Sequence, residues 1–355
     1  MRKGTRLGAI ALPLALVVGF SAEAEERDQV HTIPEFTFES GEVLPEMKVG
    51  YSTYGELNDA RDNAILVTHG TSGSRNSSNV FIGPGKAFDP DRYFVITVDA
   101  IGGGLSSQPA DELGMEFPSY TIRDMVHAQH HLVTEGLDLE RLHAVGGASM
   151  GSFQAIEWGI HYPDMAEGLL LIVPAARSEQ LFASIVDTMI AALELDPEWA
   201  DGAYKDNPRE GLVTAGMVFL PWLRSDEWLS MLKTEEQYEQ ALRSFGEGWA
   251  DAWDAISWRQ RYLASRNHDA AAPFDGDLNR ALGEITARAL IMPTPTDRLI
   301  PPAYARELYR GIEDAVYVEI PSIQGHLACC PSDEASMEYQ FITQRVSEFL
   351  DNLDR

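Results

Sequence analysis

Residues 142–158 carry the sequence LHAVGGASMGSFQAIEW, which decides the fold. An apolar, strand-like run leads into Gly147-Ala148-Ser149-Met150-Gly151, and a helical segment follows at residues 153–161. Small residues two positions before and two positions after Ser149 permit the sharp strand-to-helix turn that exposes a nucleophilic serine. At the helix N-terminus the main-chain N–H of Met150 can bind a developing oxyanion. The stretch therefore predicts a nucleophile at Ser149.

Apolar segments rich in β-branched and aromatic residues alternate with helix-like segments along the chain. Predicted strands cover residues 64–68, 93–98, 142–145, 169–173, 288–292 and 316–320, after an antiparallel edge hairpin at 36–40 and 47–54. Residues 122–135 and 335–353 are predicted helices. Continuous apolar strands separated by helices predict an α/β fold with a mostly parallel central sheet that helices flank on both faces.

One region interrupts this alternation. Residues 177–283 show helical stretches without an obvious strand. They also contain six of the seven tryptophans, Trp199, Trp222, Trp228, Trp249, Trp253 and Trp258. An insertion at this point would lie over the carboxyl ends of the strands, where ligands bind. We expect a helical cap at 177–283 and a core domain at 25–176 and 284–355, with most tryptophans in the core of the cap and one or two facing a pocket.

A serine nucleophile requires a base and an orienting acid. In the α/β-hydrolase fold these residues follow the serine in the order Asp or Glu, then His. Asp297 follows the predicted strand at 288–292, and His326 follows the strand at 316–320. Asp297 alone could be a helix N-cap, and His326 alone could be a hydrogen-bonded loop histidine. Their joint placement predicts a Ser149–His326–Asp297 triad.

The loop after the first buried strand should supply the second oxyanion donor. It reads His69-Gly70-Thr71-Ser72-Gly73, in which the N–H of Thr71 is the predicted donor and His69 is structural. The run Gly102-Gly103-Gly104 lacks the spacing of a dinucleotide fingerprint, so no cofactor is expected.

Three histidines could suggest a metal site. His127, His130 and His131 have the i, i+3 and i, i+4 spacings that place imidazoles on one helix face. No zinc-protease motif accompanies them, so a solvated helix face is the favoured interpretation and no metal is predicted.

The chain has two cysteines, Cys329 and Cys330, which are adjacent. This excludes a disulfide scaffold. Buried apolar side chains are favoured over a strained vicinal disulfide, and the sequence leaves that choice open.

The N-terminus predicts export. Basic residues (Arg2, Lys3 and Arg6) precede an apolar run at 7–20, and Ala22-Glu23-Ala24 offers a cleavage site. This is the layout of a signal peptide over residues 1–24, with an uncleaved anchor as the alternative. A periplasmic or secreted protein is expected, without membrane insertion after cleavage. Its net charge of −28 excludes nucleic acid as a partner, because phosphate binding needs clustered Lys and Arg.

Motifs spread from about residue 36 to the C-terminus carry a family resemblance. They are Phe38-Glu39-Ser40-Gly41, Val49-Gly50-Tyr51, Tyr54-Gly55-Glu56-Leu57-Asn58, residues 83–89 (GPGKAFD), 121–126 (TIRDMV) and 144–158, and Asp196-Pro197, Trp199, Gly202 and Tyr204 in the cap. In them the chain resembles the homoserine O-acetyltransferase family of the α/β-hydrolase superfamily. The resemblance implies an acyl-enzyme on Ser149, with Thr71 and Met150 as oxyanion donors.

Two positions depart from that family. Its catalytic histidine is followed by an aspartate that holds the substrate's amino group, where this chain has Leu327. The family's arginine for the substrate carboxylate corresponds to an apolar stretch near Met189 and Ile190, and Arg177 could substitute only in part. Without both charges the site loses its hold on an amino-acid zwitterion. Arg177, Met189 and Leu327 are the residues predicted to bind substrate at these positions.

These observations predict an exported serine esterase that acts on a small to medium, largely apolar ester without cofactor. The alternative is an O-acyltransferase with another hydroxyl acceptor. A non-catalytic binding protein and an amidase remain open, as does a homodimer. The expected partner is a small-molecule ester or acyl donor.

Overall fold

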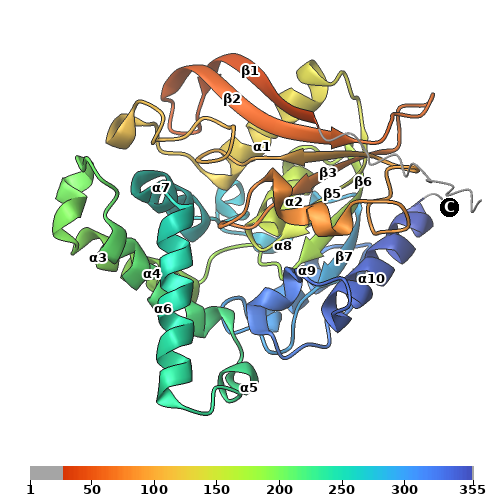
Figure 1. The fold of residues 1–355 in the computed structure, drawn as a ribbon. Coiled ribbons are helices and arrows are strands. Elements are labelled where there is room, and N and C mark those ends of the chain that lie inside the picture. The colour runs from red at the N-terminus through yellow and green to blue at the C-terminus, as the bar shows by residue number, and fades with distance from the viewer. Residues whose placement is uncertain (1–26, 354–355) are drawn as a thin grey trace, which may run out of the picture.

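The computed structural model describes residues 27–353, so the predicted signal peptide at 1–24 lies outside the described residues. A sheet of eight strands in the order β1-β2-β4-β3-β5-β6-β7-β8 forms the centre of the molecule (Figure 1). The strands are β1 (Arg27–Thr37), β2 (Val43–Tyr54), β3 (Ala64–Thr68), β4 (Phe94–Val98), β5 (Leu142–Ala148), β6 (Ala166–Ile172), β7 (Arg288–Met292) and β8 (Ala315–Tyr317). All pairs from β4 to β8 are parallel, whereas β1 and β2 form the expected antiparallel edge.

Helices cover both faces of this sheet, because its strands are apolar on both sides. In β3, Leu66 packs with the layer that contains α1 (Ile122–His131) and α2 (Met150–His161), whereas Val67 packs with α10 (Met337–Leu353) on the other face. Successive residues of a strand point to opposite faces, which explains this division. The predicted mostly parallel α/β fold is therefore confirmed.

Most predicted strand and helix boundaries differ from the structure by a few residues, and the first edge strand covers Arg27–Thr37 instead of residues 36–40. Strand β8 ends at Tyr317 instead of residue 320, although main-chain hydrogen bonds continue to Ile320. Helix α1 ends at His131 and continues as one π-helical turn, Leu132–Gly136. Helix α2 begins at Met150, three residues earlier than predicted, because Ser149 itself occupies the N-cap position.

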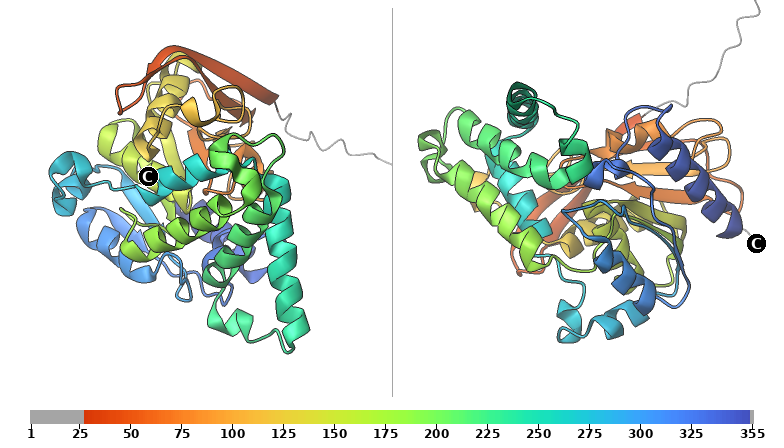
Figure 2. Two further views of the ribbon diagram at one scale, coloured as in Figure 1. Left: turned by 90° about the vertical axis from the view of Figure 1, so that its left-hand side faces the viewer. Right: turned by 90° about the horizontal axis from the view of Figure 1, so that it is seen from below.

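Residues 177–283 form helices and no strand, as predicted. They include α3 (Gln180–Glu194), α4 (Arg209–Leu223), α5 (Asp226–Leu229), α6 (Glu235–Ala252), α7 (Ala255–Arg266) and α8 (Leu278–Gly283), with shorter helical turns at Pro197–Gly202 and Ala272–Phe274. Helices α3 to α6 gather on one side of the sheet (Figures 1 and 2).

The chain leaves the sheet and returns to it at one point. Arg177 bridges Asp269, and the N–H of Ser178 donates to the carbonyl of His268 at 2.8 Å. Beyond this crossing, α8 packs against α9 (Pro302–Gly311) beside the sheet. Main-chain pairing of Arg177 and Ser178 with residues 268 and 269 thus closes the helical segment that was proposed as a cap at 177–283. The assignment of this segment as a separate domain stays a prediction.

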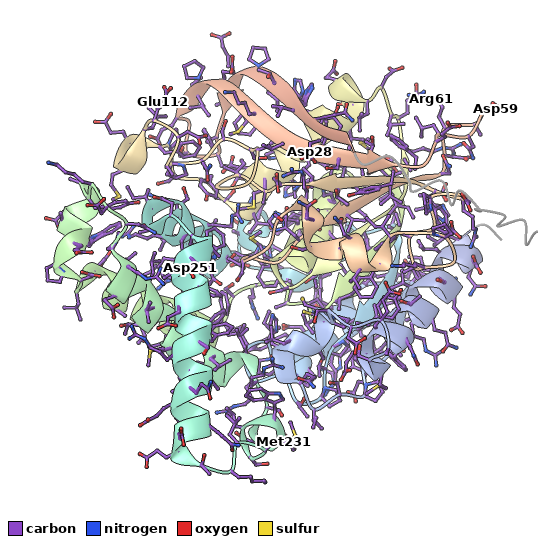
Figure 3. The ribbon with its side chains drawn as sticks, in the orientation of Figure 1. Asp28, Asp59, Arg61, Glu112, Met231 and Asp251 are labelled. Carbon is purple, nitrogen blue, oxygen red and sulfur yellow. The ribbon has the colours of Figure 1, made fainter. Side chains whose placement is uncertain are left out.

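Acidic side chains account for the negative charge at the surface. Asp59 and Glu112 are exposed and lie at the periphery of the molecule, and Asp251 is exposed on α6 (Figure 3). Within residues 27–353, no helix combines the length and the apolar character that a membrane span requires.

The three neighbouring histidines are not a solvated face, which corrects that expectation. His127 Nδ1 lies 2.8 Å from the Tyr162 hydroxyl, His130 stacks on the Tyr162 ring at 3.8 Å, and His131 Nδ1 lies 2.9 Å from His31 Nε2. These aromatic partners come from other elements, which the spacing along one helix does not reveal. Among the described residues, no three His, Cys, Asp or Glu side chains are arranged to hold a metal ion.

Candidate active site

The turn between β5 and α2 places Ser149 in a strained conformation. Its φ and ψ are 58° and −123°, outside the regions that non-glycine residues favour. The Ser149 N–H donates to the carbonyl of Ile172 on the neighbouring strand at 2.9 Å, which holds the turn in place. A Cβ at Gly147 would lie 2.3 Å from the Thr68 carbonyl oxygen, and one at Gly151 would lie 2.9 Å from the same atom. The glycines are therefore required for the close approach of β3 to the turn.

The structure brings Ser149, His326 and Asp297 together. His326 Nε2 lies 3.0 Å from Ser149 Oγ, and His326 Nδ1 lies 2.7 Å from Asp297 Oδ2. Asp297 Oδ1 accepts from the N–H groups of Leu299 and Ile300, both at 2.9 Å. The carboxylate thus stabilises its own turn with one oxygen and orients the imidazole with the other, so the two interpretations of Asp297 are compatible.

Burial makes this pair strongly electrostatic, since only 4% of His326 and 5% of Asp297 is exposed. Burial by itself lowers the pKa of His326, but the charge and hydrogen bond of Asp297 outweigh it and the net pKa is raised. With the Nδ1 proton donated to Asp297, Nε2 is left to accept the proton of the Ser149 hydroxyl. This is the arrangement that general-base activation of a serine requires.

The two predicted oxyanion donors lie on opposite sides of Ser149 in the sequence. Met150 is the first residue of α2, where main-chain N–H groups have no intrahelical acceptor. Thr71 lies in the loop after β3 and lines the same cavity as Ser149.

Two hydrogen bonds of the His69 ring stabilise the loop that carries Thr71. His69 Nε2 accepts from the N–H of Ala100 at 3.0 Å, and Nδ1 donates to the carbonyl of Gly70 at 2.7 Å. Burial, together with the nearby charge of Arg261, lowers the pKa of His69 to about 4. The ring is therefore neutral at physiological pH and acts as one donor and one acceptor.

Ser149 and His326 open into a cavity of about 360 Å³ between the sheet and the cap. Its apolar lining comes mainly from the cap and from the loops that carry Asp297 and His326. These residues are Phe182, Phe219, Leu223, Phe245, Trp249, Tyr262, Leu299 and Leu327. No Asp, Glu, Lys or Arg is among the residues that line it, all of which belong to the described part of the chain.

Of the three residues predicted to bind substrate, the structure places one in this cavity. Leu327 lines it. Met189 does not, because it lies on the buried face of α3 and is fully enclosed in the core. Arg177 lies outside it and pairs with Glu179 at 2.9 Å and Glu307 at 3.5 Å. The structure therefore places neither Arg177 nor Met189 in the cavity that contains Ser149.

Sequence reasoning missed most of the cap residues that line the cavity. The apolar positions of α3, α4 and α6 were visible in the sequence, and Trp249 was among the tryptophans expected to fill the cap or face the pocket. Periodicity identifies the apolar face of a helix but not whether that face meets another helix or a cavity.

The two cysteines form part of the cavity wall. Their Sγ atoms lie 2.7 Å apart as free thiols, with Cys329 buried and Cys330 exposed. The expectation that both are buried therefore holds for Cys329 only. The hydrogen bond between the two thiols lowers the pKa of Cys330 and raises that of Cys329.

Comparison with known proteins agrees with this geometry. Residues 63–330 match the family model described as alpha/beta hydrolase fold. The homoserine O-succinyltransferase of Alkalilimnicola ehrlichii is 31% identical over 85% of this chain and 90% of that protein. Among solved structures, the acetyl esterase MekB has a TM-score of 0.87 and 26% identity over 92% of this chain and 97% of that chain. The homoserine O-acetyltransferase of Bacillus anthracis has a TM-score of 0.84 and 26% identity, covering 92% of this chain and 98% of that chain.

Proposed function

Because this chain belongs to the homoserine O-acetyltransferase-like family of α/β hydrolases, we propose that it is an acyl-transfer enzyme of the esterase type. Its substrate would be a small to medium carboxylic ester with apolar groups beside the scissile bond. The observation that carries this proposal is the lining of the 360 Å³ cavity. Ser149 and His326 face apolar side chains there, and the described residues that line it include no Asp, Glu, Lys or Arg.

The proposed reaction needs no cofactor. Ser149 Oγ attacks the ester carbonyl while His326 Nε2 takes its proton, and the N–H groups of Thr71 and Met150 stabilise the oxyanion. Collapse of the tetrahedral intermediate expels the alcohol, which receives the proton from His326. Water then attacks the acyl-enzyme with His326 as base, and the carboxylic acid leaves as Ser149 is restored.

The cavity favours water over an amino-acid acceptor. Homoserine carries an ammonium and a carboxylate, and a buried charge without a partner is strongly disfavoured. The apolar Leu327 follows His326 at the position where the resemblance to the family implies an acid. Arg177 is ion-paired with two glutamates outside the cavity. A neutral substrate avoids the free-energy penalty of leaving those charges unpaired.

A second candidate is acyl transfer to a hydroxyl compound. It is supported by relatives such as the Alkalilimnicola homoserine O-succinyltransferase, to which this chain is similar over most of its length. Both candidates share the acyl-enzyme on Ser149 and differ only in what removes the acyl group.

The test is hydrolysis of p-nitrophenyl esters of increasing acyl chain length, with and without homoserine or a simple alcohol. Steady turnover in water that disappears in Ser149→Ala supports the esterase. The matched control is Ser230→Ala, which changes an exposed serine of the cap. A single burst without turnover, followed by acylated acceptor in the mass spectrum once the acceptor is added, would favour the transferase.

We also propose export, on the strength of the basic, apolar and Ala22-Glu23-Ala24 segments at the N-terminus. Expression of the full chain in a bacterial host and intact-mass analysis of the periplasmic fraction tests this. A mature protein that begins at Glu25 supports the proposal, and a full-length protein retained in the cytoplasm contradicts it.

A further inference from the structure

Helix α7 of the cap contacts the predicted oxyanion loop through three side chains. Arg261 Nη1 donates to the carbonyls of Thr71 at 3.3 Å and Gly73 at 3.0 Å. The Tyr262 hydroxyl lies 2.9 Å from Ser72 Oγ, and Ser265 Oγ lies 3.1 Å from Thr71 Oγ1. Arg261 and Ser265 are four residues apart, so they share one face of the helix.

Arg261 is almost completely enclosed, with 1% of its surface exposed. A second branch of its guanidinium, Nη2, donates to the carbonyl of Ala100 at 3.3 Å. The chain passes so close that a Cβ at Gly103 would lie 2.3 Å from Nη2. Within residues 27–353, Arg261 takes part in no ion pair of 4.0 Å or less, and three main-chain carbonyls accept its hydrogen bonds. The planar guanidinium spreads five N–H donors over three nitrogens in fixed directions, whereas a lysine ammonium carries its three donors on one nitrogen.

Hydrogen bonds hold both peptide planes that flank Thr71: His69 and Gly73 hold the plane that carries the Thr71 N–H, and Arg261 holds the adjoining one. The Gly70 carbonyl accepts from His69 Nδ1 at 2.7 Å and from the N–H of Gly73 at 2.8 Å. In a trans peptide the C=O and the following N–H point in opposite directions, so holding the Gly70 oxygen sets the direction of the Thr71 N–H. Arg261 holds the next plane through the Thr71 carbonyl.

We propose that Arg261 is a positioning residue that keeps the Thr71 N–H aimed at the developing oxyanion. The inference rests on the proposed acyl transfer at Ser149 and is independent of whether water or an alcohol accepts the acyl group. It makes α7 a fixed part of the active site and not a lid that moves away from it. Preorganised donors contribute most when they cannot reorient during the reaction, which is what a buried fork of hydrogen bonds provides.

The test compares Arg261→Ala and Arg261→Lys with Arg259→Ala. Arg259 lies on the same helix and pairs with Glu194 at 2.9 Å, away from the oxyanion loop. Active sites are first counted with a fluorophosphonate that labels Ser149, so that rates refer to folded enzyme. We expect the acylation rate per labelled site to fall roughly 10- to 100-fold in Arg261→Ala, as for a misplaced catalytic group, with KM within about threefold. Arg261→Lys retains the charge but not the planar set of donors, and its acylation rate is expected to lie between those of Arg261→Ala and wild type.

Two further readouts separate positioning from a general loss of structure. Added guanidinium ion should restore part of the rate of Arg261→Ala but leave Arg259→Ala unchanged. A trifluoromethyl ketone, whose adduct with Ser149 places an oxyanion at the same point, should lose affinity in proportion to kcat/KM.

The outcomes distinguish this inference from the proposed function. The positioning role is overturned if both Arg261 variants show the wild-type acylation rate per labelled site. It is also overturned if the variants contain fewer labelled sites but each remaining site reacts at the wild-type rate. If Arg261→Ala yields no folded protein, Arg261→Lys and Ser265→Ala carry the test, and wild-type rates per site in both would also overturn it. Wild-type enzyme that shows no acylation with any ester would instead reject the proposed function.

Discussion

His326 Nδ1 lies 2.7 Å from Asp297 Oδ2, and both side chains are almost entirely shielded from solvent. This contact fixes the tautomer of the imidazole and leaves Nε2 facing Ser149 Oγ at 3.0 Å. It also stabilises the imidazolium that forms when Ser149 loses its proton. The charge relationship between these two residues therefore determines both the pH range and the rate of the proposed reaction.

The raised pKa of His326 predicts an acid limit to activity. Ser149 is activated by neutral His326, so kcat/KM should fall as the pH drops through the pKa of the free enzyme. Because Asp297 raises that pKa, the midpoint should lie above the ordinary histidine value of about 6.5. A pH profile of kcat/KM for ester hydrolysis checks this, and a midpoint clearly below the ordinary histidine pKa of about 6.5 would contradict it.

Replacing Asp297 with Asn should impair catalysis far more than folding. The amide can no longer hold the imidazole in the required tautomer, and kcat is expected to fall by about 10⁴-fold. The measurement is kcat per fluorophosphonate-labelled site. Asp226→Asn, at an exposed position in α5, serves as the control. A loss of less than tenfold would argue against Asp297 as the orienting acid.

Gly147→Ala should destabilise the turn that presents Ser149. The added Cβ would lie 2.3 Å from the Thr68 carbonyl, and forcing a methyl group into packed backbone is expected to lower the free energy of unfolding by about 1–3 kcal/mol. Urea denaturation measures this change. The matched variant is Gly248→Ala on the exposed side of α6, where nothing lies within 4 Å of the new Cβ. Removing a helical glycine there should stabilise the protein by up to about 1 kcal/mol, so equal effects of the two variants would refute the steric argument.

Leu327→Asp should weaken the binding of apolar esters. It places a carboxylate in the wall of the cavity beside His326, and an unpaired polar group in such a site is expected to raise KM about tenfold or more. Leu327→Met, which conserves volume, should stay close to wild type. Steady-state kinetics with the preferred ester provides the measurement, and homoserine is tested as acceptor in parallel. An unchanged KM in Leu327→Asp would mean that this part of the cavity does not contact substrate.

Cys330 should react with iodoacetamide before Cys329. The lowered pKa of its exposed thiol increases the thiolate fraction near neutral pH, whereas Cys329 is buried and its pKa is raised. Because Cys330 lines the catalytic cavity, the carbamidomethyl group is expected to reduce ester turnover. Peptide mapping at a series of pH values identifies the modified residue, and Cys330→Ser should abolish the fast phase. Preferential labelling of Cys329 would contradict the assignment.

The core of the molecule could be predicted because local sequence and global fold agree there. The predicted bounds of β3 and β7 coincide with the structure, since each is a short apolar run that ends at polar or turn-forming residues. Ser149, Asp297 and His326 follow three strands of one parallel sheet, whose carboxyl ends meet at a single edge. Chain order was therefore enough to predict that these residues come together.

The cap could not be predicted to the same depth. Met189 is apolar and lies on a helix, yet its side chain packs inside the cap, whereas Phe182 on the same helix lines the catalytic cavity. Arg177 was the nearest cation in the sequence, but glutamates 2 and 130 positions away neutralise it. Arg261, 190 residues from Thr71, gave no signal in the sequence at all.

The sequence alone determined the α/β fold, the order of the sheet-forming segments and the residues of the triad, because strand periodicity and the strand–turn–helix geometry are local properties. The packing of the folded chain, by contrast, establishes which cap side chains line the cavity, which charges are already paired, and which residues hold the oxyanion loop. Those features depend on how helices far apart in the chain pack against one another, and the orientation of a packed helix face is set by its neighbours and not by its own sequence.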